Sequence, residues 1–130
     1  MNKIFVSRDK IITDSDAVLV NGNVIKLLNS DIYSLEYNNI DEISLCIEVD
    51  NGVDAVLFES SFLDDVKVNN RYIVLNGRLR VNKFYNNNSV FENIDIDLCR
   101  DNAEIDYRFS NICRNEENYV ININHNAVGT

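Results

Sequence analysis

The sequence predicts an all-β fold built from many short strands. Apolar and polar residues alternate with period two, most clearly in residues 91–98, 101–110 and 120–127, and this alternation is typical of half-buried strands. Turn signals recur about every 8–12 residues, as in a sandwich, a barrel or a solenoid. A faint repeat with an offset of about 47–48 residues would suit two coils of a solenoid of about 20–25 residues each. Chance similarity among strands of one composition would look much the same, so both explanations stay open.

The predicted strands follow one another at short intervals. They lie at residues 4–6, 17–20, 24–28, 32–37, 43–49, 55–59, 72–75 and 79–84, followed by the three segments above. In residues 43–49 the odd-numbered positions are apolar and share one face, whereas the even-numbered positions carry Ser44, Cys46 and Glu48. Residues 60–68 fit either one or two helical turns or a strand and a loop, so both alternatives stay open.

Asparagine and aspartate are expected to form the turns, because the chain has no proline and only four glycines. Asparagine tolerates left-handed backbone angles and bonds to its own backbone, so it can turn a strand without glycine. We expect turns at residues 21–23, 38–39, 50–52, 69–70, 76–77 and 86–88.

Length and charge limit the class of protein. The 130 residues suit a single domain. The formal net charge of −9 would repel phosphate backbones and anionic lipid, so we expect no nucleic-acid and no membrane partner. No apolar stretch approaches the roughly 18–20 residues of a membrane span, and the N-terminus lacks the apolar core of a signal peptide. We therefore expect a cytoplasmic location.

The three cysteines are the first candidates for chemistry. Cys46, Cys99 and Cys113 are odd in number and widely spaced, which does not look like a disulfide framework and fits reduced thiols. Strand parity places Cys46 and Cys99 away from the apolar face. They would serve as thiolate ligands in one interpretation; in the other, which we favour, both faces of the strands are covered and the thiols simply pack.

The remaining candidates are the single histidine and the paired acids. His125 shares parity with Ile121 and Ile123, so it is either a metal ligand or, as we favour, a satisfied side chain at a strand end. Asp95 and Asp97 lie on one face about 7 Å apart by the strand rise, a spacing that could suit paired-carboxylate chemistry. We favour a solvated face for them. No catalytic residue and no metal site is assigned; the candidate ligands are Cys99, Cys113 and His125.

Three passages near the end of the sequence stand out. They are IDIDL at residues 94–98, DNAEI at residues 101–105 with the small residue Ala103, and VININHNAVGT at residues 120–130, a strand that ends in a histidine followed by small or polar residues and a threonine. These passages resemble the SufB/SufD family of iron–sulfur cluster assembly proteins. Upstream, residues 44–59 resemble the strand–turn–strand passage that enters the family's core. The resemblance covers about residues 43–130, and residues 1–42 add short N-terminal strands to the same domain.

The resemblance implies a right-handed parallel β-helix that serves as a non-catalytic scaffold component of the SUF system, not as an enzyme. The implied partners are a SufC-like ATPase and a SufB/SufD-like paralogue. In the family the core continues past the histidine-containing strand to later cysteine and histidine ligands, so this chain would be a partial core segment, truncated or shortened. We expect no cofactor in this segment; an iron–sulfur cluster could belong to the full-length assembly. A coil cut open there would expose unpaired backbone, so we also expect self-association around residues 120–127.

Two other hypotheses stay open. The runner-up is a small β-sandwich that binds a ligand or a protein without cluster chemistry, and a more distant one is a hydrolase that uses Asp95 and Asp97. Parallel coils would distinguish the solenoid from the antiparallel hairpins of a sandwich.

Overall fold

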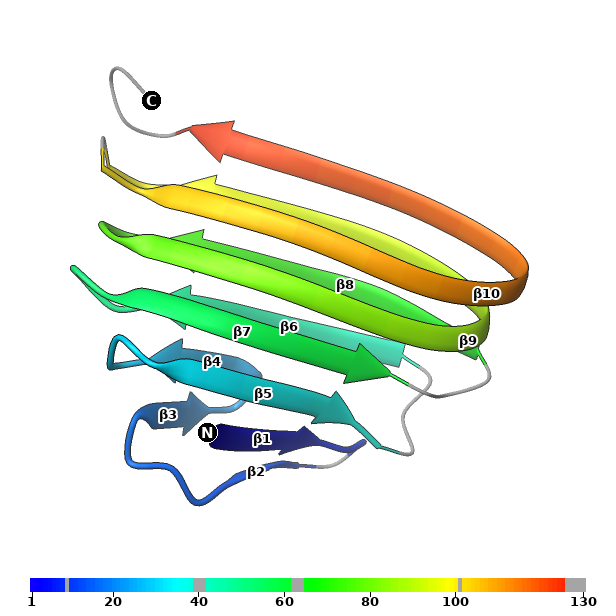
Figure 1. Ribbon diagram of the computed structural model, residues 1–130, viewed down its shortest axis with the longest axis horizontal. Helices are drawn as coiled ribbons and strands as arrows, with labels where there is room; N and C mark the ends of the chain where they lie inside the picture. Colours follow the sequence, from blue (N-terminus) through cyan, green and yellow to red (C-terminus); the bar gives the residue numbers. More distant parts are fainter. Residues whose placement is uncertain (9, 39–41, 62–64, 101, 126–130) are drawn as a thin grey trace.

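The chain folds into a β-solenoid of about four turns, shown as a computed structural model in Figure 1. The structure describes residues 1–8, 10–38, 42–61, 65–100 and 102–125, apart from the side chains of residues 88, 111–117 and 125. Its strands are β1 (Asn2–Val6), β2 (Ile11–Thr13), β3 (Val18–Asn21), β4 (Val24–Leu27), β5 (Ile32–Tyr37), β6 (Glu42–Val49), β7 (Asp54–Ser61), β8 (Asp65–Val74), β9 (Arg78–Leu98) and β10 (Glu104–His125).

Each turn of the solenoid crosses from a front sheet to a back sheet (Figure 1). The front sheet contains β1, β5, β7 and the first halves of β9 and β10, and the back sheet contains β4, β6, β8 and the second halves of β9 and β10. Neighbouring coils pair in parallel throughout, from β1–β5 and β5–β7 to β4–β6 and β6–β8. This parallel pairing confirms the solenoid and excludes the antiparallel sandwich.

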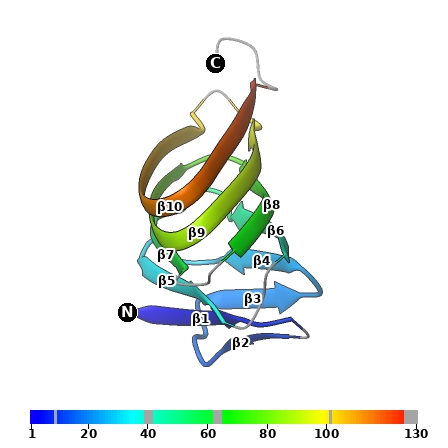
Figure 2. The ribbon, with the colours of Figure 1, turned by 90° about the vertical axis from the view of Figure 1, so that its right-hand side faces the viewer.

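The two longest strands each serve both sheets. In β9, residues 78–85 pair with β7 and residues 89–98 pair with β8, so the strand bends around the corner between them (Figure 2). The last strand, β10, follows β9 along its whole length, with a register shift between Cys113 and Glu116. The expected separate strands therefore merge: residues 79–84 and 91–98 belong to one strand, and so do residues 104–110 and 120–125.

Two of the expected asparagine turns are wrong, because the asparagines lie inside strands. Asn70 points into the solenoid, where its side chain accepts the Leu45 N–H at 3.1 Å and donates to the Tyr37 hydroxyl at 3.0 Å. Asn87 is fully buried at the corner of β9 and donates to Ser61 Oγ at 3.2 Å. A buried amide is tolerated when it is hydrogen-bonded, so these residues stabilise the coil stack instead of turning the chain.

The repeat is real, but its register differs from the expected one. Asp54 aligns with Arg78 and Arg78 aligns with Glu104, so the same position recurs after 24 and then 26 residues. Ala55 accordingly aligns with Leu79 and through it with Ile105, not with Ala103. The turn that precedes β10 is longer than the turn that precedes β9. The two coils therefore span 24 and 26 residues, which together exceed the expected offset of about 47–48 residues.

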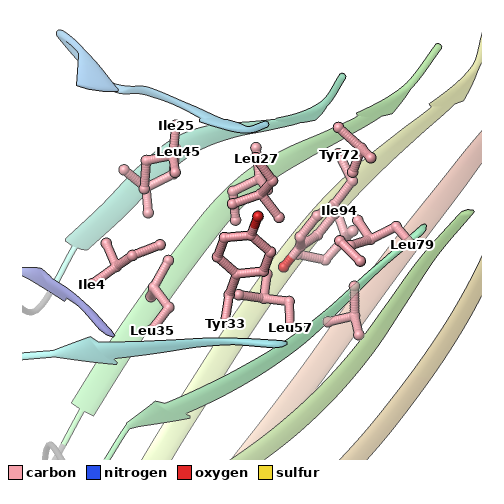
Figure 3. Packing of buried hydrophobic residues seen from close by; sticks show 14 of the residues in the cluster. Ile4, Ile25, Leu27, Tyr33, Leu35, Leu45, Leu57, Tyr72, Leu79 and Ile94 are labelled. Atoms are coloured by element: carbon pink, nitrogen blue, oxygen red, sulfur yellow. The ribbon is translucent and has the colours of Figure 1, made fainter. Parts of the chain in front are cut away.

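The core lies between the two sheets and is filled by every second side chain of each strand. In β6 the burial alternates from Glu42 to Val49, as the period-two pattern predicted. Isoleucine, leucine and tyrosine side chains from both sheets meet in the interior (Figure 3). A helix and a strand were both open for residues 60–68; residues 60–61 end β7 and residues 65–68 begin β8, whereas residues 62–64 lie outside the described part of the chain.

The turns between coils stack closely at one position. A Cβ atom added to Gly77 would lie 2.2 Å from the carbonyl oxygen of Val53 in the coil below. The backbones are held there by Arg78 N–H donating to the Val53 carbonyl at 2.9 Å and Glu104 N–H donating to the Gly77 carbonyl at 2.9 Å. Glycine is required because any side chain would separate these stacked turns.

The two ends of the solenoid differ. At the N-terminal end, β2 pairs antiparallel with β1 and β3 pairs antiparallel with β4, so short hairpins cover the first coil. At the C-terminal end, β10 pairs with β9 along one edge, and Val120, Ile121 and Ile123 are about half exposed. Self-association through this edge stays a prediction.

Candidate functional site

Two groups of charged side chains stand out, one inside the solenoid and one outside. The inner group centres on Lys83 of β9, whose side chain is fully buried. Its Nζ lies 2.7 Å from Glu92 Oε1 and 3.7 Å from Glu59 Oε2, and both carboxylates are also buried. Burying three charges is tolerated only when they compensate one another.

Tyrosines complete the inner group. The hydroxyl of Tyr37 donates to Glu59 Oε2 at 3.1 Å, and the hydroxyl of Tyr72 donates to Glu59 Oε1. The ammonium of Lys83 lies over the rings of Tyr72, Tyr85 and Tyr107, at 5.3, 5.7 and 5.0 Å from their centroids. Ring faces carry negative charge, so these contacts further compensate the lysine.

Burial controls protonation in this group. Loss of solvation raises the pKa of Glu92, and the neighbouring Lys83 ammonium opposes that rise. Burial also raises the pKa of Tyr37, Tyr72 and Tyr107 above the ordinary value of 10. Their hydroxyls are therefore protonated at neutral pH. Tyr37 and Tyr72 accordingly act as hydrogen-bond donors to Glu59, whereas the Tyr107 hydroxyl is buried without a hydrogen-bond partner among the described groups. The charged side chains of the group are sealed inside the coil stack.

The outer group forms a groove on the front sheet. It encloses about 390 Å³ and is lined by Val56, Arg78, Arg80, Asn82, Asp106 and Arg108. Three consecutive coils contribute, since Val56 aligns with Arg80 and Arg80 aligns with Asp106. Stacking of coils thus gathers three guanidinium groups on the outer face of an acidic chain.

The arginines of the groove have loose partners. Arg78 Nε lies 3.6 Å from Glu104 Oε2, and a terminal nitrogen of Arg80 lies 3.8 Å from Asp54 Oδ2. Both arginine side chains are 42% exposed. Such pairs contribute little to stability because water competes with them. The Nε of Arg80 is buried and has no hydrogen-bond partner among the described groups.

Aromatic side chains border the groove. Phe58 of β7 aligns with Asn82 and is 44% exposed, and Phe84 of β9, two residues beyond Asn82, is 42% exposed. Side chains two residues apart on a strand point to the same side. The groove therefore has a charged part and an adjacent apolar part on one accessible face.

The cysteine candidates are not brought together into a described site. Cys46 is half-buried on the outer face of the back sheet and aligns with Arg71. Burial raises the pKa of its thiol, with Arg71 opposing the rise. A raised pKa disfavours the thiolate that a ligand needs, so packing remains the better interpretation. Cys99 is half-buried just beyond β9, where its N–H donates to the Val74 carbonyl at 3.0 Å.

Cys113 and His125 have side chains outside the described part of the structure. By backbone register, Cys113 aligns with Asn87 and His125 aligns with Leu98. His125 thus stands in the same row as a core leucine by backbone register, and the interpretation of its side chain stays a prediction. Among the described residues, no group of three or more histidine, cysteine, aspartate or glutamate side chains could hold a metal ion.

Asp95 and Asp97 belong to a row of hydrogen bonds on the back sheet. Arg71 Nε donates to Asp97 Oδ2 at 2.6 Å, and Asn124 Nδ2 donates to Asp97 Oδ1 at 3.0 Å. Asn122 Nδ2 donates to Asp95 Oδ1 at 3.2 Å. The solvated-face interpretation suits Asp95, which is only partly buried, but is wrong for Asp97, which is 5% exposed.

Neither charged group was predicted from the sequence, although the signal for one of them was present. Glu59, Lys83 and Glu92 each lie at an inward position in strands whose other inward positions are mostly apolar, with Ser61 and Asn87 as uncharged polar exceptions. A charge at such a position predicts a buried ion pair. The groove gave no comparable signal, because its residues are brought together by coil register alone.

Within the described chain there is no helix whose length and apolar character would allow it to cross a membrane. Comparisons with protein-family models, with curated proteins and with solved structures find no match to this chain.

Proposed function

We propose that this chain is a non-catalytic scaffold that holds a partner protein against its front sheet. The contrast between the two charged groups carries the proposal. Glu59, Lys83 and Glu92 bond to one another inside the coil stack, whereas the arginine groove and the exposed Phe58 and Phe84 lie on one outer face. Exposed aromatic and arginine side chains are the types enriched in protein interfaces.

Site-specific photo-crosslinking tests the proposal. A benzophenone-bearing phenylalanine analogue is placed at Phe58 on the front sheet and, as the matched control, at Phe91, which is 40% exposed on the back sheet. We expect Phe58 to capture one partner protein in cells, which is identified by mass spectrometry and rebinds the chain when purified. Equal capture from both positions, or none from either, would contradict the proposal.

SUF-type iron–sulfur cluster assembly is the specific setting that the resemblance suggests for this scaffold. The fold is compatible with it, since residues 94–98 and 121–125 lie side by side in consecutive parallel coils. In this setting the chain would bind a SufC-like ATPase and a SufB/SufD-like paralogue, without turnover of its own. Co-elution of the purified proteins in size-exclusion chromatography is expected. Separate elution would exclude these partners while leaving the general scaffold to the crosslinking experiment.

A further inference from the structure

We infer that the arginine groove binds the carboxylates of an acidic, extended peptide segment of a partner protein, with an apolar side chain of that segment resting on Phe58 and Phe84. This inference rests on the proposed scaffold function and adds the chemistry of the ligand.

The spacing of the guanidinium groups suits an extended peptide. Arg78 and Arg80 are two residues apart on one face of β9, which places their Cα atoms about 7 Å apart. The same distance separates alternate side chains of an extended ligand, so two carboxylates at alternate positions can meet both arginines. Arg108 aligns with Asn82 on the next strand, about 4.8 Å across the sheet. Its guanidinium donates to both carboxylate oxygens of Asp106 at 3.4 and 3.3 Å, so it supplies a third donor group to a ligand once this exposed pair opens.

The present partners of the arginines can be exchanged for a ligand. The pairs with Glu104 and Asp54, at 3.6 and 3.8 Å, are longer than charge-assisted hydrogen bonds of about 2.7–2.9 Å. The Nε–H of Arg80 is buried and has no hydrogen-bond partner among the described groups, so the guanidinium of Arg80 is not fully engaged by its present partner. A planar guanidinium binds a carboxylate through two parallel hydrogen bonds, which these pairs do not achieve.

The mixed charge of the groove favours a peptide over a uniform polyanion. Asp106 lines the groove, and Asp54 and Glu104 stand beside Arg78 in the same row. These carboxylates, together with the net charge of −9, would repel closely spaced phosphates. A peptide that carries separate acids avoids this repulsion, and its apolar residues can use the neighbouring phenylalanines.

Fluorescence anisotropy tests the inference on the full chain. The probe is a fluorescein-labelled nonapeptide with glutamate at three alternate positions followed by leucine, and the matched probe carries glutamine instead of glutamate. We expect the acidic peptide to bind at least about tenfold more tightly than the glutamine peptide, a difference of about 1.4 kcal/mol. The double variant Arg78→Gln/Arg80→Gln should lose this preference, whereas Lys67→Gln, on the exposed face of β8, should retain it. Circular dichroism confirms that the variants are folded.

Three outcomes would overturn the inference. The first is equal binding of both peptides, and the second is a preference for the acidic peptide that survives in the double arginine variant. The third is displacement of the labelled acidic peptide by inorganic phosphate or single-stranded DNA at a lower concentration than the unlabelled acidic peptide requires. The scaffold proposal is judged separately. If crosslinking from Phe58 persists in the double arginine variant, the scaffold stands and only the acidic ligand is rejected.

Discussion

The inner and the outer charged groups use the same kinds of side chain in opposite surroundings. Lys83, Glu59 and Glu92 are sealed in the lumen at 0–1% side-chain exposure, while Arg78 and Arg80 pair with carboxylates at the surface with 42% exposure. Charge interactions are strong where water is excluded and weak where it is not. The inner group should therefore govern stability, and the outer group should be available for binding.

Replacing the inner lysine should have the largest effect. Lys83→Met keeps the volume of the side chain but leaves two carboxylates buried without their cation. We expect a loss of about 3–5 kcal/mol in the free energy of unfolding, measured by urea denaturation. Lys67→Met, at an exposed position of β8, is the matched control and should change stability little. A loss below about 1 kcal/mol for Lys83→Met would mean that the lumen is far better hydrated than its burial indicates.

Removing one hydroxyl from the inner group should have an intermediate effect. Tyr72→Phe deletes the donor to Glu59 Oε1 and preserves the ring that lies beside Lys83. Because Glu59 Oε1 then loses its buried donor while Oε2 keeps Tyr37, we expect a loss of about 1–3 kcal/mol in the same urea experiment. If Tyr72→Phe is as stable as the parent chain, the hydrogen bond to Glu59 makes no net contribution.

The pH dependence of stability should reveal the inner group by its sign. Burial raises the folded-state pKa of Glu92 above its ordinary value of 4.5, so the folded chain holds the proton more tightly than the unfolded chain. This contribution to stability is present below about pH 4.5 and is lost as the pH rises through the raised pKa. Glu92→Gln should remove this loss.

Urea denaturation at about pH 4.5 and about pH 7 measures the change for both chains. The pH-dependent change in unfolding free energy is compared between the parent chain and the variant. This comparison isolates the contribution of Glu92, because the other carboxylates titrate in both chains. If the unfolding free energy changes between the two pH values by the same amount in the parent chain and in Glu92→Gln, the pKa of Glu92 is not raised.

Substitution in the outer group should affect stability least. Arg78→Gln breaks the 3.6 Å pair with Glu104 at the surface, and we expect a change below about 1 kcal/mol. Thermal unfolding monitored by circular dichroism is sufficient to detect a larger one. A loss comparable to that of Lys83→Met would remove the distinction between the two groups and make the groove a structural element.

Much of the fold could be predicted from the sequence, and the errors have identifiable physical causes. The period-two pattern located β5 and β6 closely, because alternation reports directly which side chains are buried. The separate expectation that asparagines form turns failed at Asn70 and Asn87, which are held in strands by hydrogen bonds to neighbouring coils. The local preference of asparagine for turns was outweighed by hydrogen bonds to residues about one coil away in the sequence.

The candidate site was less predictable than the fold. Cys46 was placed correctly on the outward face, but Asp97 was expected in solvent and is buried by Arg71 and Asn124. Its partners come from the coils on either side, and no local pattern reports them. Arg78 and Arg108 acquire a shared role only because β9 and β10 align in one register.

The class of fold follows from local sequence alone, because alternating strands that bury one face require a β architecture and a recurring coil length allows them to stack. Which residues share a row follows only from the folded chain, because turn length sets the register between coils and a small error in register brings together the wrong side chains. The strands β9 and β10 illustrate both points. Their alternation is a local property, whereas their bend around one corner and their stacking in one register depend on contacts between distant parts of the chain.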